Sequence, residues 1–147
     1  MSGITGILHT CDDALRVGRA VESLRGCDEV LVVDGGSRDR TCEVARRFGA
    51  RIVEDVGEAK YEWIFCLRAS EVVQETLEAE LLEWNGRDVV CEGLFVSILE
   101  ETREGWREVP AEVRLVRRAK VRWDGSRPVV DGTLGRLEGH LARLRLP

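Results

Sequence analysis

The chain has 147 residues, of which 44% are hydrophobic and 33% carry a charge, and its formal net charge is −5. This length suits one domain with a full core, and this composition excludes a disordered or membrane-spanning chain. No apolar run approaches the roughly 18 residues of a transmembrane helix. The N-terminal stretch MSGITGILHTCDD is too short and uncharged for a signal peptide, so we expect a cytoplasmic protein.

The first part of the chain, residues 1–87, alternates strands with amphipathic helices. Short apolar runs predict strands at residues 4–9, 29–34, 51–54 and 62–67. Apolar residues at three- and four-residue spacing predict three helices that end at Gly26, Gly49 and Asn85-Gly86. Their inner faces would carry Ala14, Val17, Val21 and Leu24, then Cys42, Ala45 and Phe48, then Val73, Leu77, Leu81 and Trp84. This order requires right-handed crossovers and predicts a parallel sheet.

The segment VLVVDGGSRDRT, residues 30–41, is the most informative in this part. A buried strand ends at the carboxylate of Asp34, and Gly35 and Gly36 allow a sharp turn and a close approach of a ligand to the backbone. Ser37 is a good helix N-cap, and Asp39 is predicted in the first helical turn, where negative charge is favourable. A strand, a carboxylate, a glycine-rich turn and a helix start in this order are typical of a nucleotide pocket in an open α/β sheet.

The remaining residues, 88–147, follow a different pattern. Alternating segments predict strands at 88–99, 112–117 and 120–123, with an exposed loop at 102–110. The leucines at positions 134, 137, 141 and 144 predict a short helix within residues 132–146. We therefore predict one α/β domain over residues 1–147, whose mostly parallel sheet is flanked by helices and extended by antiparallel strands.

Cysteine spacing and charge distribution say less about function. The five cysteines are odd in number and form no C-x-x-C pair, so we predict buried free thiols rather than disulfides or zinc ligands, and His9 and His140 are a poor metal pair. Residues 1–102 carry 11 basic and 21 acidic groups, whereas residues 103–147 carry 11 and 6. The basic C-terminal part can face phosphates or an anionic membrane. Arginine-rich, solvated strands are the favoured interpretation.

Several segments together resemble a known family. ITGILHTCDD, a helix and DEVLVVDGGSRDRTCEVARRFGARIVE resemble the start of family-2 glycosyltransferases of the GT-A fold, in particular the bacterial subgroup that builds lipopolysaccharide core and other envelope glycans. EWIFCLRASEVVQETLEAEL resembles the strand, metal motif and helix of that subgroup, and AEVRLVRRAKVRWDG its late β-hairpin. The resemblance covers most of the chain and implies a GT-A-like, Rossmann-like fold that binds a nucleotide-sugar.

By position, the resemblance implies roles for particular residues. Thr10 and Asp12 or Asp13 would meet the nucleotide, and Asp34 with Gly35 would receive its base or ribose, a suitable place for a fixed acceptor. For Asp39, nucleotide binding and a simple capping role are both open. The resemblance also implies a uridine or guanosine diphosphate sugar as donor and a glycan or lipid-linked acceptor, with no nucleic-acid partner.

The family's D-x-D metal motif is missing. Its positions read Arg68-Ala69-Ser70, and Glu71 follows. Mg²⁺ and Mn²⁺ need carboxylate oxygens beside the diphosphate, which arginine and serine do not supply. We therefore expect no metal cofactor, and Arg68 would either bind the diphosphate directly as a bidentate cation or be an exposed arginine at a strand end.

Two further features of the family, the helix that closes the nucleotide pocket and a clear general base, are missing from the sequence. The helix that closes the nucleotide pocket is replaced by EDVGEAKYE, residues 54–62, and this would expose an apolar patch at Tyr61 and Trp63 that a second copy covers in a homodimer. The only candidates for a general base are Asp124 and Asp131, for which turn roles are favoured. The catalytic residues are therefore unassigned, and three functions stay open. They are a working transferase, an inactive relative acting as a nucleotide-binding or oligomeric scaffold, and a nucleotidyltransferase-like domain, which suffers from the same lack of metal ligands.

Overall fold

The computed structural model describes residues 3–146, and its N-terminal half is a parallel sheet. The strands are β1 (Ile4–Thr10), β2 (Glu29–Asp34), β3 (Arg51–Val53) and β4 (Trp63–Arg68), joined by helices α1 (Val17–Ser23) and α2 (Thr41–Arg47) and by the 3₁₀ turn η1 (Val56–Glu58). They lie in the order β3-β2-β1-β4, and every pairing among them is parallel. The predicted parallel arrangement is confirmed.

The second half continues the same sheet with mixed orientation. Its elements are β5 (Glu71–Val73), α3 (Glu75–Leu82), the 3₁₀ turn η2 (Gly86–Asp88), β6 (Gly93–Thr102), β7 (Gly105–Arg117) and β10 (Leu134–Arg143). The sheet runs on from β4 in the order β7-β6-β10-β5, with antiparallel pairs except for the parallel pair of β6 and β10. A separate antiparallel ribbon consists of β8 (Arg122–Asp124) and β9 (Arg127–Val129).

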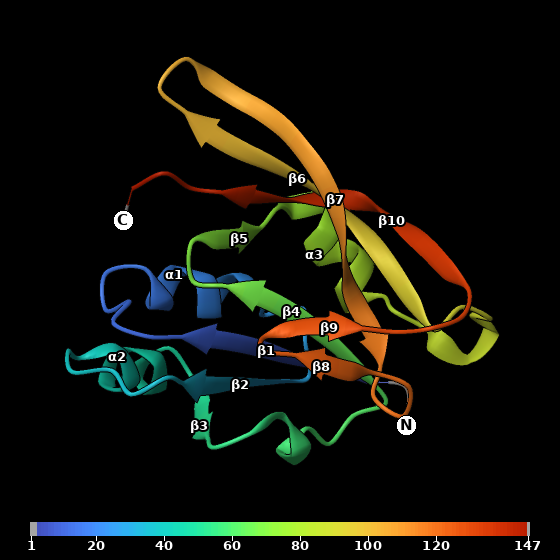
Figure 1. Cartoon of the computed structure of the whole chain (residues 1–147), viewed down its shortest axis with the longest axis horizontal. Coiled ribbons are helices and arrows are strands. Elements are labelled where there is room, and N and C mark those ends of the chain that lie inside the picture. The colour runs from blue at the N-terminus through green and yellow to red at the C-terminus, as the bar shows by residue number, and fades with distance from the viewer. Residues whose placement is uncertain (1–2, 147) are drawn as a thin grey trace.

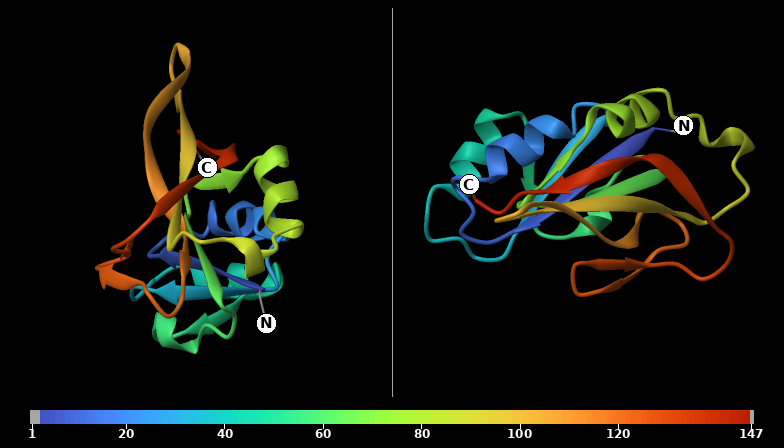
Figure 2. Two further views of the ribbon diagram at one scale, coloured as in Figure 1. Left: turned by 90° about the vertical axis from the view of Figure 1, so that its right-hand side faces the viewer. Right: turned by 90° about the horizontal axis from the view of Figure 1, so that it is seen from above.

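The layers are visible in Figures 1 and 2. Helices α1, α2 and α3 cover one face of the sheet, and the β8–β9 ribbon lies over the opposite face. The distal part of the β6–β7 hairpin projects from the body as an arm. The carboxyl ends of β1 and β2 are level, because Thr10 lies beside Asp34 in the register. The loops that follow these strands therefore meet at one edge of the sheet.

Both faces of the parallel strands are buried, which explains their nearly continuous apolar sequences. Toward the helices, Ile4 and Leu8 of β1 join the large core. Toward the ribbon, Ile7 of the same strand joins a smaller cluster with Leu31 and Ile64. Within residues 3–146, no helix combines the length and apolar character needed to cross a bilayer.

The predicted helix within residues 132–146 is wrong, because residues 134–143 form strand β10. Leu137 and Leu141 are buried on one side of this strand, four residues apart. A spacing of four fits both the helical and the strand period, so the leucines alone do not separate the two. Gly139 lies between them, and a Cβ at this position would come within 2.3 Å of the backbone nitrogen of Leu77 in α3. The close packing of α3 on β10 therefore requires a glycine here.

Other predicted boundaries also need correction. The predicted loop at 102–110 is instead the end of the β6–β7 hairpin, whose turn lies at residues 103–104. Its sequence is hydrophilic because the arm projects into solvent, where even Trp106 is 55% exposed. The third helix begins at Glu75, and Val73 belongs to β5 rather than to the helix. Ser37 does not cap α2, which begins at Thr41, and the carboxylate of Asp39 accepts from the Thr41 backbone nitrogen at 2.9 Å instead.

The predicted apolar patch at Tyr61 and Trp63 is absent. Trp63 is fully buried, stacked edge-on against Trp84 at 5.0 Å between ring centroids, with the guanidinium of Arg117 4.4 Å from its ring. The segment around Gly86 covers it, since a Cβ there would meet the Trp63 indole. Two predicted buried side chains are exposed: Phe48, which is 45% exposed, and the thiol of Cys11, whereas Cys66 and Cys91 are buried.

Candidate functional site

Two acidic loops meet at the carboxyl ends of β1 and β2 and bond to one another. Asp12, which has a positive φ of 53°, accepts from the Arg38 backbone nitrogen at 2.7 Å, and its own nitrogen donates to Ser37 Oγ at 2.9 Å. The Asp13 nitrogen donates to Thr41 Oγ1 at 2.8 Å. Each loop thus satisfies polar groups of the other, which fixes their shape without a ligand.

The remaining predicted nucleotide-binding residues lie in the same two loops. The Gly35 nitrogen donates to the Thr10 carbonyl oxygen at 2.8 Å, and the Thr10 hydroxyl donates to Asp13. Asp34 accepts from the backbone nitrogens of Ser37 at 2.8 Å and Gly36 at 3.2 Å, and also from the Ser37 hydroxyl. The fold therefore brings together all six residues, namely Thr10, Asp12, Asp13, Asp34, Gly35 and Asp39.

Two carboxylates of these loops, those of Asp34 and Asp39, are held in the ionised form. Burial opposes ionisation of Asp34, but the hydrogen bonds from Ser37, Cys42 and Gly36 outweigh it and lower its pKa. The Thr41 hydroxyl is the main cause of the lowered pKa of Asp39, which also accepts from backbone nitrogens. The loops therefore present fixed, negatively charged acceptors, a surface suited to the N–H and O–H donors of a nucleoside.

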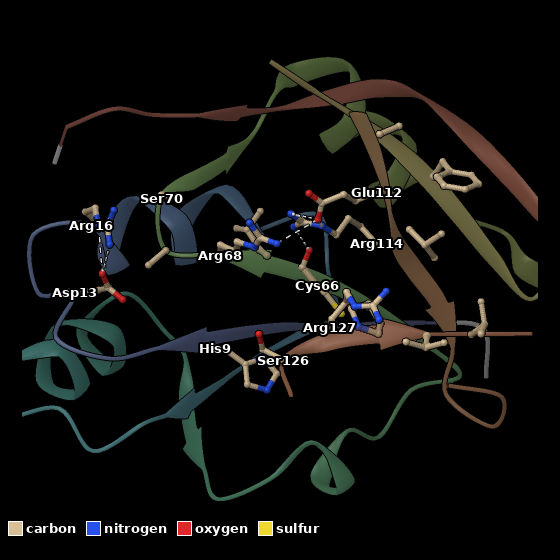
Figure 3. A pocket seen from close by; sticks show the side chains of 18 residues that line it. His9, Asp13, Arg16, Cys66, Arg68, Ser70, Glu112, Arg114, Ser126 and Arg127 are labelled. Atoms are coloured by element: carbon tan, nitrogen blue, oxygen red, sulfur yellow. Dashed lines mark hydrogen bonds and ion pairs between the residues drawn. The ribbon is translucent and has the colours of Figure 1, made fainter. Parts of the chain in front are cut away.

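A cavity of about 720 Å³ adjoins these loops, between the carboxyl ends of β1 and β4, strand β7 and the β8–β9 ribbon. Figure 3 shows Asp13 and Arg16 at one end of it, with Arg68, Glu112, Arg114 and Arg127 gathered toward the other. Its charged lining consists of four arginines and two carboxylates, from Arg16, Arg68, Arg114, Arg127, Asp13 and Glu112. Arg114 and Arg127 have carboxylate partners outside the lining, Glu71 and Asp124, so the charges balance overall. On the cavity surface itself guanidinium groups outnumber carboxylates, which favours an anionic ligand.

The floor of the cavity includes His9 and its roof is the ribbon. The Trp123 ring of β8 lies against the His9 imidazole, with 6.0 Å between centroids. Burial lowers the pKa of His9, so this imidazole is neutral near pH 7. Asp124 and Asp131, the predicted general-base candidates, are exposed and pair with Arg127 at 2.8 Å and Arg122 at 3.2 Å, and neither lines the cavity.

Glu71, the first residue of β5, is the carboxylate that remains beside the position of the family's metal motif. It is fully buried and accepts from Arg114 at 2.7 and 2.8 Å, from Arg143 at 3.0 Å and from the Arg68 backbone nitrogen at 2.9 Å. Burial opposes its ionisation, but the hydrogen bonds and charges of the two arginines lower its pKa. Glu71 is therefore occupied by protein donors.

These residues do not fit the divalent metal that the family implies. Arg68 and Ser70 offer no carboxylate, and the oxygens of Glu71 are already bonded to guanidinium groups. Among residues 3–146, no cluster of three or more histidine, cysteine, aspartate or glutamate side chains is placed to hold a metal ion. Where the family has its metal motif, the positive charges in this structure are those of Arg68, Arg114 and Arg143.

The Arg68 side chain extends from the strand end along the cavity wall. Its guanidinium Nη2 lies 3.3 Å from Glu112 Oε1, and its side chain is 55% exposed. Arg68 and Asp13 of the acidic loops line the same cavity. The predicted residues thus form one loop cluster, and Arg68 lines the cavity that adjoins it.

Sequence reasoning missed most of the cavity lining. Arg16 had a local signal, because its spacing from Asp13 allows the i,i+3 ion pair that the structure contains in the turn before α1. Arg127 belongs to the basic C-terminal part, for which phosphate binding was one interpretation. The pairing of Arg114 with Glu71 joins strands 43 positions apart and has no sequence signal.

Comparison with known proteins agrees with this architecture. No family profile matches the chain. It is 30% identical over 94 residues to an uncharacterised glycosyltransferase of Rickettsia felis and 32% identical over 91 residues to one of Rickettsia bellii. These alignments cover 55% and 53% of the chain, but only 33% and 31% of the relatives. The chain thus spans about a third of the length of these relatives.

Solved structures show the same fold. S. aureus TarS (1–349) superimposes with a TM-score of 0.58 at 16% identity, covering 75% of this chain and 38% of TarS. Mannosyl-3-phosphoglycerate synthase from Rubrobacter xylanophilus gives a TM-score of 0.50 at 17% identity, covering 70% and 41%. The fold is GT-A-like, and the predicted resemblance to family-2 glycosyltransferases is confirmed.

Proposed function

We propose that this chain is a family-2 glycosyltransferase-like protein that binds a nucleotide-sugar and holds the donor diphosphate with arginine in place of a metal ion. The observation that carries this proposal is the arginine-lined cavity beside the acidic loops, with Arg68 at the position of the metal motif. In this arrangement the acidic loops receive the nucleoside and the cavity receives the diphosphate and sugar. The acceptor would be a glycan or a lipid-linked sugar.

The chemistry of guanidinium supports this exchange of metal for arginine. A guanidinium group can form two parallel hydrogen bonds to a phosphate and keeps its charge at any physiological pH. A metal ion and an arginine both offset the negative charge of a diphosphate, and that charge grows on the leaving group as the sugar is transferred. Arg68 can therefore serve both binding and leaving-group stabilisation.

The test is calorimetric titration of the chain with uridine and guanosine diphosphates and their sugars in the presence of EDTA. We expect binding that does not change when Mn²⁺ replaces EDTA. R68A should weaken it about tenfold or more, the range expected for a charge-assisted hydrogen bond. R25A is the matched control, because Arg25 also pairs with one carboxylate, Glu78, at 2.8 Å but does not line the cavity. A strict requirement for Mn²⁺, or equal effects of R68A and R25A, would contradict the proposal.

A second candidate is an inactive relative that binds nucleotide or serves as an oligomeric scaffold. The observation in its favour is that both carboxylates lining the cavity already have cationic partners, since Asp13 pairs with Arg16 and Glu112 with Arg114 at 3.1 Å. Inverting transfer needs a carboxylate free to accept the proton of the acceptor hydroxyl. Release of nucleoside diphosphate from a nucleotide-sugar, abolished by D34A, would decide for the transferase.

Self-association is a separate part of the second candidate. The buried position of Trp63 removes the apolar patch from which a homodimer was predicted. Light scattering at tens of micromolar measures the assembly state directly. A monomer that binds nucleoside diphosphate without turnover would support a nucleotide-binding module and contradict the oligomeric scaffold.

A further inference from the structure

The ion pair between Arg68 and Glu112 is unequal in its two partners. Arg68 contacts one carboxylate, Glu112, at 3.3 Å. Glu112 contacts two further guanidinium groups, those of Arg114 at 3.1 Å and Arg143 at 3.3 Å. Among residues 3–146, Glu112 therefore keeps two cationic partners when Arg68 moves away, whereas Arg68 keeps no carboxylate partner.

Burial makes the same distinction. The Arg114 side chain is 4% exposed and is fixed by Glu71, and the Arg143 side chain is 19% exposed and bonds to the same carboxylate. Arg68 is 55% exposed, so breaking its contact with Glu112 leaves no charge buried without a partner. Among the arginines around Glu112, Arg68 is the one that can turn at little cost.

We propose that Glu112 is a positioning residue that holds Arg68 against the cavity wall in the free protein and releases it to an entering diphosphate. This inference rests on the proposed function, because it assigns the ligand of Arg68 as a phosphate group. The Arg68 backbone nitrogen stays bonded to Glu71 at 2.9 Å, so the strand end remains in place while the side chain changes partner. Glu112 competes with the ligand for the guanidinium group.

The consequence has an unusual sign, because removing the charge of Glu112 should tighten ligand binding. E112Q is expected to strengthen the binding of inorganic pyrophosphate and uridine diphosphate in EDTA about two- to fivefold, the range that a single exposed ion pair carries. A less negative cavity would attract an anion even if Arg68 did not move. The experiment must therefore separate release of Arg68 from a general change in potential.

A double-mutant cycle makes this separation. The affinity is measured for the wild type, E112Q, R68A and the double variant. If Glu112 acts by competing for Arg68, the gain from E112Q disappears in the R68A background. If the gain persists there unchanged, the general potential explains it and the proposal is overturned. E100Q is the control for charge removal in the same network, since Glu100 pairs with Arg143 at 3.4 Å but not with Arg68.

A second variant keeps the proposal testable if E112Q perturbs Arg114. E112D retains the charge but shortens the side chain by one methylene group, which withdraws it from Arg68, and it should also tighten binding. Weaker or unchanged binding in both variants, with folding intact by thermal unfolding, overturns the proposal. If the wild type binds diphosphate and R68A does so much more weakly, but E112Q and E112D do not change the affinity, this inference is wrong and the proposed function stands. Absence of any diphosphate binding removes both.

Discussion

The acidic loops and the arginine-lined cavity lie side by side at one edge of the sheet, but different forces hold them. In the loops, carboxylates accept hydrogen bonds from backbone nitrogens and hydroxyls of the two connections, as Asp34 does from Ser37. Around the cavity, charged side chains from strands far apart in the chain pair with each other, as Arg114 and Arg143 do with Glu71. The loops are therefore built by short connections, and the cavity wall by the tertiary fold.

This difference has a functional meaning. A surface whose acceptors are fixed by backbone donors keeps its geometry when a ligand arrives, which suits recognition of a nucleoside. An ion-pair network can exchange one partner for another, which suits binding of a mobile, highly charged diphosphate. The shared edge places a rigid acidic surface beside an adaptable basic one.

The largest expected effect comes from the buried ion pairs behind the cavity wall, where Glu71 meets Arg114 and Arg143. E71Q removes the buried charge that faces Arg114 and Arg143, and leaves these cations without their main partner. Removing one member of a buried ion pair costs about 3–5 kcal/mol of the free energy of unfolding. Urea denaturation measures it, with E100Q on the exposed side of the network as the control.

A loss below about 1 kcal/mol for E71Q would mean that the two arginines find other partners and that the wall does not depend on Glu71. The contrast between the two regions would then be wrong, because the ion-pair network would tolerate the loss of one charge as well as the loops do.

The same contrast explains what the sequence could predict. The strands through Arg68 and the loop cluster followed from local patterns, because parallel strands joined by short connections place their loops together. The ion pairs behind the cavity wall could not be predicted, because Glu71 and Arg143 lie 72 positions apart in the sequence. Each charged residue taken alone would be predicted to be exposed. Strand β10, which carries Arg143, was predicted as a helix because the spacing of Leu137 and Leu141 fits both periods. The position of Arg68 could be anticipated from the family pattern, but its contact with Glu112, a carboxylate that Arg114 and Arg143 also contact, could not.

A smaller effect is expected in the loops. D34N removes the charge that accepts from the backbone nitrogens of Gly36 and Ser37, while keeping the size of the side chain. The loss should be about 1–2 kcal/mol, because charge-assisted hydrogen bonds are weakened but an amide oxygen still accepts. Urea denaturation near pH 7 measures this change.

Acid provides the check on this interpretation. The folded-state pKa of Asp34 lies below its ordinary value, so its contribution is complete above that value and disappears as the pH falls through the folded pKa. The difference in stability between the wild type and D34N should therefore begin to shrink below about pH 4 and disappear only below the folded-state pKa. A constant difference down to low pH would show that the loss in D34N comes from altered packing rather than from charge.

The smallest effect is expected at His9, on the strand that joins the two regions. Burial lowers its pKa, so the folded protein keeps the imidazole neutral where the unfolded chain already binds a proton. Stability should be unaffected above about pH 6.5 and should fall as the pH drops from that value toward the folded pKa, since the unfolded state then binds more protons. H9Q should flatten this slope, and NMR titration of the imidazole measures the pKa itself. A His9 pKa at or above 6.5 would mean that water reaches the imidazole freely, and that the β8–β9 ribbon, whose Trp123 lies against His9, does not close the roof of the cavity.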